Sequence, residues 1–163
     1  EAIYFRNNVT LRTPNTANNG FHSVQQFVNG TVLAPNQPSF FCYPTASFSA
    51  SAGSLKYTFA GEAHDSNNEY NNVTGKFTAP VAGRYLFTAG IYAQASTDNF
   101  MAILVNGGGS WGGAHVFNES GQTSSGTFSV IVNLAASDYV GLNCLYDVQG
   151  STPRNFFSGH LLS

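Results

Sequence analysis

Residues 70 to 87 read Tyr-Asn-Asn-Val-Thr-Gly-Lys-Phe-Thr-Ala-Pro-Val-Ala-Gly-Arg-Tyr-Leu-Phe, and this stretch decides the fold. It joins a turn rich in Asn and Gly to a short apolar strand, and that strand to a second turn that contains Pro and Gly. Few folds require a turn, a strand and a turn in this order. The stretch therefore narrows the choice of fold more than any other part of the chain.

The same stretch resembles the signature of the complement C1q globular head, which reads roughly Tyr-Asp-x-x-Thr-Gly-x-Phe-Thr-Cys-Pro-Val-Pro-Gly-x-Tyr-x-Phe. The chain departs from that pattern at Asn71, Ala79 and Ala82. Pro-Ser-Phe-Phe at 38–41 and Phe-Ser-Gly-His-Leu-Leu at 157–162 are similar to the family's opening and closing strands. The resemblance spans residues 38 to 163. It implies an all-β, two-sheet jelly-roll sandwich of the C1q and tumour-necrosis-factor type, assembled as a homotrimer.

The pattern from about residue 39 onward agrees with an all-β sandwich. Short apolar runs alternate with clusters of Gly, Asn, Ser and Asp, and no stretch shows a helical period. Eight or nine strands suit a jelly roll. The expected strands are Ser39 to Tyr43, Ser54 to Phe59, Gly75 to Phe77, Gly83 to Ala93, Phe100 to Asn106, Ala114 to Phe117, Gly126 to Leu134, Tyr139 to Tyr146 and Asn155 to Leu162.

Two of these strands, Gly83 to Ala93 and Asn155 to Leu162, carry apolar residues on both faces. A two-sheet sandwich buries only one face of each sheet, so the second face needs a cover. We expect other copies of this chain to provide it, and the alternative is a loop or the N-terminal segment. The residues that we assign to the trimer interface are Tyr85, Phe87, Phe157 and Leu161.

Residues 1 to 37 lie outside the resemblance and contain short apolar pieces broken by Pro, Asn and Gly. Such pieces cannot bury themselves alone. We expect a β-rich stem or collar shared by three chains, or an arm packed on the head, with a hinge at residues 35 to 38. A short β segment that ends in Pro-Asn-Gln-Pro-Ser-Phe at 35–40 and leads into such a head resembles the C-terminal ends of bacteriophage fibre and spike proteins. A collagen-like Gly-X-Y tract or heptad coil, common before animal C1q heads, does not occur in this sequence.

Composition makes several partners improbable. Only 9% of the 163 residues are charged and the net charge is −2, so the chain has no basic footprint for nucleic acid or anionic lipid. No apolar run reaches the length of a membrane span. The chain starts at Glu1 without Met or a leader, and we expect a mature or excised product of extracellular origin, either secreted or on a virion surface. Sequons at Asn8, Asn29, Asn72 and Asn118 occur about as often as chance predicts and carry little weight.

The two cysteines, Cys42 and Cys144, fall in apolar strands and are expected to point into the core. Facing sheets lie about 10 Å apart, whereas a disulfide needs Cα atoms roughly 5.5 Å apart. Two buried thiols are therefore favoured over one bridge.

The glycine-rich run from Gly107 to Gly112 fits the strings of a nucleophile elbow and of a dinucleotide site. Both motifs work only where a strand leads into a helix. Another strand is expected here, so we read both matches as false positives and predict no enzymatic activity and no catalytic residue.

Metal-binding patterns are weak. The histidines show no ligand spacing, and the loop from Gly61 to Asn68 could hold calcium through Glu62 and Asp65, although solvated acidity is the favoured reading. No cofactor is therefore expected, with calcium left open. His160 stands where the family pattern has Phe; a hydrogen-bonded histidine in the sandwich interior is favoured over a cluster of three imidazoles on a threefold axis.

Trp111 is the strongest candidate for ligand binding. It is the only tryptophan and lies in what reads as a glycine-rich loop, where a large ring could stack on the apolar face of a sugar. Tyr146, Asp147 and Arg154 could approach it from the same end of a jelly roll. It is an equally good interpretation that the Trp111 ring packs against its own subunit or against a neighbouring one.

These observations favour a non-enzymatic, homotrimeric recognition head. Three roles compete: the tip of a phage or virus fibre or spike that binds cell-surface glycans or another receptor, a secreted C1q-type lectin or innate-recognition protein of an animal, and a structural capsid or matrix decoration. Repetition of weak sugar contacts on a rigid trimer would supply avidity in the first two.

Overall fold

The computed structural model describes residues 9–15, 20–28, 31–34, 36–46, 48–50, 58–94, 99–116, 123–144, 148–150 and 155–163. The chain divides into two compact units, Glu1–Gln37 and Pro38–Ser163. The first unit contains one antiparallel sheet in the order β1-β2-β3, formed by β1 (Val9–Asn15), β2 (Gly20–Val28) and β3 (Thr31–Leu33).

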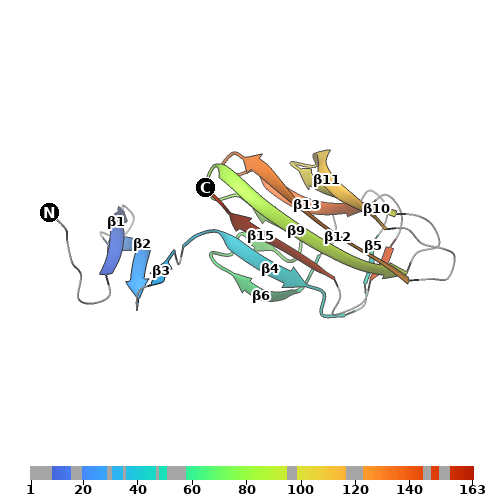
Figure 1. Cartoon of the computed structure of the whole chain (residues 1–163), viewed down its shortest axis with the longest axis horizontal. Coiled ribbons are helices and arrows are strands. Elements are labelled where there is room, and N and C mark those ends of the chain that lie inside the picture. The colour runs from blue at the N-terminus through green and yellow to red at the C-terminus, as the bar shows by residue number, and fades with distance from the viewer. Residues whose placement is uncertain are drawn as a thin grey trace. The chain divides into compact units, whose positions relative to one another are not determined.

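The second unit is a sandwich of two antiparallel sheets, the architecture of a jelly roll (Figure 1). One sheet has the order β11-β10-β13-β8-β7, and we call it the five-stranded sheet. Its strands are β7 (Tyr70–Asn71), β8 (Lys76–Thr78), β10 (Asn99–Val105), β11 (Gly108–Val116) and β13 (Tyr139–Cys144).

The other sheet, the seven-stranded sheet, has the order β5-β14-β9-β15-β4-β6, with β12 paired to the free side of β9. Its strands are β4 (Ser39–Tyr43), β5 (Phe48–Ala50), β6 (Gly61–Asp65), β9 (Gly83–Gln94), β12 (Thr123–Leu134), β14 (Val148–Gly150) and β15 (Phe156–Leu161). Figure 1 shows β4, β6, β9, β12 and β15 side by side in one layer. Among the described residues, no helix has the length and apolar character to cross a membrane.

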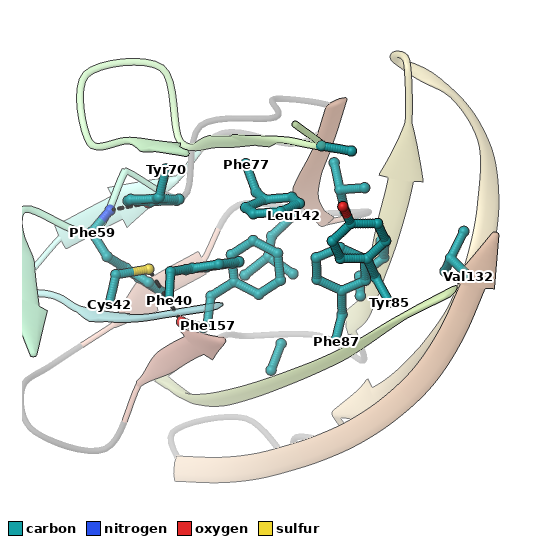
Figure 2. Packing of buried hydrophobic residues seen from close by; sticks show 14 of the residues in the cluster. Phe40, Cys42, Phe59, Tyr70, Phe77, Tyr85, Phe87, Val132, Leu142 and Phe157 are labelled. Atoms are coloured by element: carbon teal, nitrogen blue, oxygen red, sulfur yellow. Dashed lines mark hydrogen bonds between the residues drawn. The ribbon is translucent and has the colours of Figure 1, made fainter. Parts of the chain in front are cut away.

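The core between the sheets is built from aromatic rings. Phe40 stacks on Tyr70 and Phe77, with centroids 5.2 and 5.0 Å away, and meets Phe157 edge-on at 5.0 Å. Phe77 also packs edge-on against Phe87 at 5.6 Å. These rings point toward one another from both sheets (Figure 2). Offset and edge-on pairs add to the energy of burial, so this cluster holds the two layers together.

The segment from Tyr70 to Phe87 supplies four of the core rings and both of the turns that aim them. Asn71 Oδ1 accepts hydrogen bonds from the backbone N–H groups of Val73 and Thr74, each 2.9 Å long, and Gly75 follows with a φ of 69°. This is the Asx turn that the Asn-rich sequence predicts. Beyond β8, Ala79 exchanges backbone hydrogen bonds with Ser137 and Asp138, which fixes the point where the chain crosses to the seven-stranded sheet.

The structure contains three short strands that were not expected, β5, β7 and β14, and two of the expected strands differ in position. Within the part of Ser54 to Phe59 that the structure describes, residues 58 and 59 are not a strand, and a strand, β6, lies at Gly61–Asp65 instead. The reason is pairing: β6 aligns with β4, and Gly61 lies beneath the ring of Tyr43, where a Cβ would clash. The second difference concerns β11, which begins six residues earlier than the expected Ala114.

Candidate functional site

The seven-stranded sheet has a second face, turned away from the core, which we call the outer face. Pairing aligns Ser39, His160, Leu86 and Ile131 across β4, β15, β9 and β12, and it aligns His64, Phe41, Ser158, Thr88 and Ser129 in the next row. Leu86 is half-buried, whereas Ile131 is 57% exposed. Apolar side chains therefore remain accessible on this face in a single chain.

The trimer-interface residues expected from the sequence lie on the opposite face. Tyr85, Phe87 and Phe157 are 0% exposed and form part of the core, and Leu161 is half-buried against it. The tyrosine hydroxyl also donates a 2.8 Å hydrogen bond to Val81 O. Both strands were correctly identified as two-faced. The assignment of Tyr85, Phe87 and Phe157 to the interface was wrong, because these three side chains offer no surface to another chain.

Two aromatic side chains cover the outer face near one end. Phe41 and Phe156 stack at 5.6 Å with an interplanar angle of 8°. Phe156 lies over Gly90, where any Cβ would collide with its ring. Both rings are only half-buried, so they form an apolar platform on β4 and β15.

A groove of about 310 Å³ lies beside this platform, lined by Ser39, Phe40, Phe41, His64, Leu86, Thr88, Ser158, Gly159 and His160. Its polar groups are hydroxyls and imidazoles. The Thr88 and Ser129 hydroxyls are 2.8 Å apart and share a hydrogen bond, as do those of Ser39 and Ser66 at 2.7 Å. The groove can therefore accept and donate hydrogen bonds around an apolar floor.

His160 and His64 are both exposed in this groove. The expectation that His160 lies in the sandwich interior was wrong, because the alternation of β15 places Phe157 and Gly159 toward the core and His160 on the outer face. Gly159 fixes this orientation of β15, because it lies against the rings of Phe40 and Phe87 in the core, where a Cβ atom would clash.

Trp111 lies within β11 and not in a loop, which corrects the reading of the glycine-rich run. Asn106 and Gly107, with φ values of 53° and 74°, form a two-residue hairpin turn, and β11 pairs with β10 directly afterwards. Glycine is depleted in strands, so the run reads as a loop, whereas the Asn-Gly pair was the signal for a hairpin. One continuous strand at Gly108–Val116 also lacks the strand-to-helix junction that both glycine motifs need.

Of the four residues expected to bind a ligand, the structure describes only the backbone of Trp111. The side chain of Trp111 and the residues Tyr146, Asp147 and Arg154 lie outside the described residues. The grouping of these four residues stays a prediction.

The candidate calcium loop is closed by its own hydrogen bonds. Asp65 Oδ1 and Oδ2 accept from the backbone N–H groups of Glu69 and Tyr70 at 3.0 and 2.9 Å, and Glu69 Oε1 accepts from Asn67 Nδ2 at 2.7 Å. Burial of Glu69, together with nearby Asp65, raises the pKa of its carboxyl group. Across the described ranges, no group of three or more His, Cys, Asp or Glu residues is placed to hold a metal.

Cys42 is a free, fully buried cysteine, as the sequence favoured. Its thiol donates a 3.2 Å hydrogen bond to Phe157 O, and burial raises its pKa to about 12. Burial also raises the pKa of the neighbouring Tyr70 hydroxyl, which accepts a hydrogen bond from Phe59 N. A protonated thiol in this position is a packing group and not a nucleophile. The side chain of Cys144 is outside the described set.

The five-stranded sheet carries two polar features that the sequence did not indicate. Lys76 Nζ lies 4.0 Å from the centroid of the Tyr139 ring, a cation–π contact. On the same strand as Tyr139, the buried atom Asn143 Oδ1 has no hydrogen-bond partner. A single polar residue in a strand gives no periodic pattern in the sequence. The contact between Lys76 and Tyr139 therefore becomes visible only when β8 and β13 are paired.

Comparison with known proteins shows that the second unit is similar to a described domain family and to several solved structures. A family model described as the C1q domain matches residues 39–162. The globular domain of zebrafish complement 1qA protein has a TM-score of 0.64 and 18% identity, covering 78% of this chain and 98% of that chain. Eiger TNF from S. frugiperda has a TM-score of 0.62 and 12% identity, covering 78% and 94%. Murine APRIL at pH 5.0 also has a TM-score of 0.62, with 10% identity and coverage of 77% and 99%. No curated protein matches the chain.

Proposed function

Because the chain belongs to the C1q domain family, we propose that it is a non-enzymatic, homotrimeric recognition head that binds cell-surface glycans at the tip of a virion fibre or spike, such as that of a phage. The observation that carries the homotrimeric part of this proposal is the outer face of the seven-stranded sheet. It combines the Phe41–Phe156 platform, exposed Ile131 and the adjoining groove on a sandwich whose core is already complete.

The outer face suits self-association better than the core residues that the sequence suggested. A monomer that left this face in water would expose a mixed patch of aromatic, aliphatic and hydroxyl groups across five strands. Two further copies would bury it and leave the outer surface of the five-stranded sheet and the loops free to bind a ligand. Three identical sites on one rigid body then raise avidity through effective concentration.

Glycan recognition is assigned to Trp111 with Tyr146, Asp147 and Arg154. An indole ring stacks on the apolar face of a sugar, while the other three residues offer an aromatic surface, an acceptor and a fork-shaped donor. No cofactor is proposed. The fibre or spike role is supported by the short β unit that precedes the head.

A secreted animal lectin or innate-recognition protein is the second candidate. It is favoured by the likeness to the globular domain of zebrafish complement 1qA protein. The sequon at Asn72 lies in an exposed turn, so a glycan would fit there. Mass spectrometry of native material, intact and after digestion, distinguishes the candidates: N-acetylhexosamine and hexose mass on the peptide that contains Asn72 supports secretion, and an unmodified chain supports the virion.

The test of recognition is a glycan array that includes bacterial polysaccharides and sialylated animal glycans. It should be probed with the native chain, with Trp111→Ala and with the control Val73→Ala, which removes an exposed side chain from a turn on another part of the head. We expect binding by the native chain and the control, and at least about a tenfold loss in Trp111→Ala, a loss near the lower end of the roughly 1–3 kcal/mol that aromatic stacking contributes for a nucleic-acid base. If the native chain forms a trimer and binds no glycan, the recognition role fails and a structural decoration takes its place.

A further inference from the structure

The turn between β10 and β11 is fastened by side-chain hydrogen bonds to the turn that leads into β13. Asn106 Nδ2 donates to Asp138 Oδ1 at 2.7 Å, and Asn106 Oδ1 accepts from the backbone N–H of Tyr139 at 2.9 Å. We call these two hydrogen bonds the Asn106 clamp. Together they occupy both polar atoms of the Asn106 amide, although Asn106 lies in an exposed turn.

Asp138 is positioned for this contact by its own turn. Its second carboxylate oxygen, Oδ2, accepts a 2.7 Å hydrogen bond from the backbone N–H of Ala135, and its backbone carbonyl accepts one from Ala79 N. The hydrogen bonds from Asn106 and Ala135 lower the pKa of the Asp138 carboxyl group, so this group is ionised at neutral pH. Hydrogen bonds to an ionised acceptor are stronger than those to a neutral one.

Asn106 is followed by Gly107, and this pair of residues is open to a reaction of its own. Glycine has no side chain to shield its backbone nitrogen, which can attack the Cγ atom of the preceding asparagine. The new N–Cγ bond closes a five-membered imide, the Cγ–Nδ2 bond breaks, and Nδ2 leaves as ammonia with the proton of the glycine nitrogen. Water then opens the imide to aspartate or isoaspartate. Both residues are exposed, so water reaches the turn.

The clamp opposes this reaction in the folded chain. Attack requires the Asn106 side chain to turn toward the nitrogen of Gly107, whereas the clamp holds its polar atoms on Asp138 and Tyr139. The backbone is held as well, because Asn106 N donates to Tyr139 O at 2.9 Å and the two turn residues have φ values of 53° and 74°. The reaction therefore proceeds from a turn that has opened locally.

We propose that Asn106 is a deamidation site that the Asp138 carboxylate keeps closed in the folded head, and that its conversion releases the β10–β11 turn permanently. An aspartate at position 106 has no side-chain N–H to donate, and its carboxylate would face that of Asp138 across the 2.7 Å contact. Two carboxylates this close repel each other, so the clamp cannot re-form. Isoaspartate also adds a backbone atom to a two-residue turn whose length sets the hairpin. All of these groups belong to one chain, so the proposal depends neither on the trimer nor on a glycan.

The test follows deamidation of the full chain during incubation at mildly alkaline pH, with the rate at each asparagine read by peptide mass spectrometry. We expect Asn106 to react at least about tenfold more slowly in the native chain than in the urea-unfolded chain, since only an open turn reacts. Asp138→Ala should react at least about fivefold faster than the native chain while its circular dichroism spectrum stays folded, because a hydrogen bond to a charged acceptor is lost. The matched control Glu62→Ala removes an exposed carboxylate from β6 and should keep the native rate.

Equal rates at Asn106 in the native and unfolded chains, or in the native chain and Asp138→Ala, overturn the proposal. Two further Asn-Gly pairs, at 19–20 and 29–30, are read in the same digest. Equal acceleration of all three pairs in Asp138→Ala would show general unfolding and also overturns a local gate. If Asp138→Ala does not fold, Asp138→Asn replaces it, since this change removes one of the two acceptor oxygens.

A second arm tests the reaction product. Asn106→Asp should lower the melting temperature by at least about 2 °C, because two carboxylates then meet in the clamp. Adding Asp138→Asn to this variant exchanges the two partners, so that an amide at 138 donates to a carboxylate at 106, and most of the loss should be recovered. Calorimetry measures both variants. An unchanged melting temperature in Asn106→Asp, or no recovery in the double variant, contradicts the permanent release.

Discussion

The two faces of β9 and β15 look alike in sequence and differ completely in the structure. The core face carries Tyr85, Phe87 and Phe157, which are packed against the five-stranded sheet and fully buried. The outer face carries Leu86, Phe156 and His160, which remain half-buried or exposed. The comparison teaches that apolar alternation identifies a two-faced strand, whereas the facing sheet decides which of the two faces becomes the core of the subunit and which remains accessible.

The largest expected effect comes from breaking the core face. Phe40→Ala removes a ring that contacts Tyr70, Phe77 and Phe157, and should lower the free energy of unfolding by about 3–5 kcal/mol. Urea titration monitored by circular dichroism measures this change. A loss below about 1 kcal/mol would mean that Phe40 is not central to the core.

The second prediction breaks the outer face alone. Leu86→Asp in residues 38–163 should convert a trimer to a monomer, because three carboxylates would be buried in the contact, while the circular dichroism spectrum stays unchanged. Thr78→Asp is the matched control, since Thr78 is exposed on the other sheet. Light scattering gives the mass of each. A trimeric Leu86→Asp head, or a monomeric control, contradicts the assignment of the interface.

Gly159 and Gly90 sharpen the comparison, because both lie in the seven-stranded sheet but contact rings on opposite faces. Gly159 contacts core rings, and Gly90 contacts Phe156 on the outer face. In Gly159→Ala the new Cβ would lie 2.5 Å from the Phe40 ring, and the overpacked core should lose about 1–3 kcal/mol of stability. In Gly90→Ala the Cβ would displace Phe156, so the trimer should dissociate at a higher concentration while the monomer's stability changes less. Unfolding and dilution experiments on both variants should therefore give opposite rankings. The same ranking in both experiments would show that the two faces are not separate.

A smaller effect is expected at high pH. The raised pKa values of Cys42 and Tyr70 mean that the folded chain favours their neutral forms, so the stabilising contribution is complete below pH 9 and is lost as the pH approaches 12. Stability measured from pH 8 to 11 should fall, and Cys42→Ala, although less stable at pH 8, should show a shallower fall. Parallel curves for the two proteins would exclude a contribution from this thiol.

The smallest effect is expected from calcium. Both oxygens of Asp65 already accept backbone hydrogen bonds. We therefore expect that calcium or a chelator, each added at about 5 mM, leaves the melting temperature of the protein unchanged within about 1 °C. Calorimetry checks this. A calcium-dependent increase of several degrees would show that the loop rearranges to bind the ion.

Much of the fold follows from local sequence signals. The Asn71 turn, the strand around Phe77 and the strand from Gly83 could be predicted because turn residues and alternation act over a few positions. The strand β6 could not, because its position depends on pairing with β4, which is distant in sequence. The hairpin before Trp111 was missed for another reason: the Asn-Gly signal was present, but the following glycines masked the strand.

The assignment of the two faces of β9 shows the limit of the same reasoning. Alternation alone cannot say whether Tyr85 or Leu86 faces the core, because both neighbours are apolar. The deciding contacts, such as Phe87 against Phe77 and Gly159 beneath Phe40, join residues from separate strands and appear only in the folded sandwich.

The most direct test of the outer-face assignment is the light-scattering mass of residues 38–163 at micromolar concentration. A mass three times that of one chain agrees with an outer face buried between copies. A mass of one chain would show that this face is stable in water, and would contradict the proposed basis of assembly.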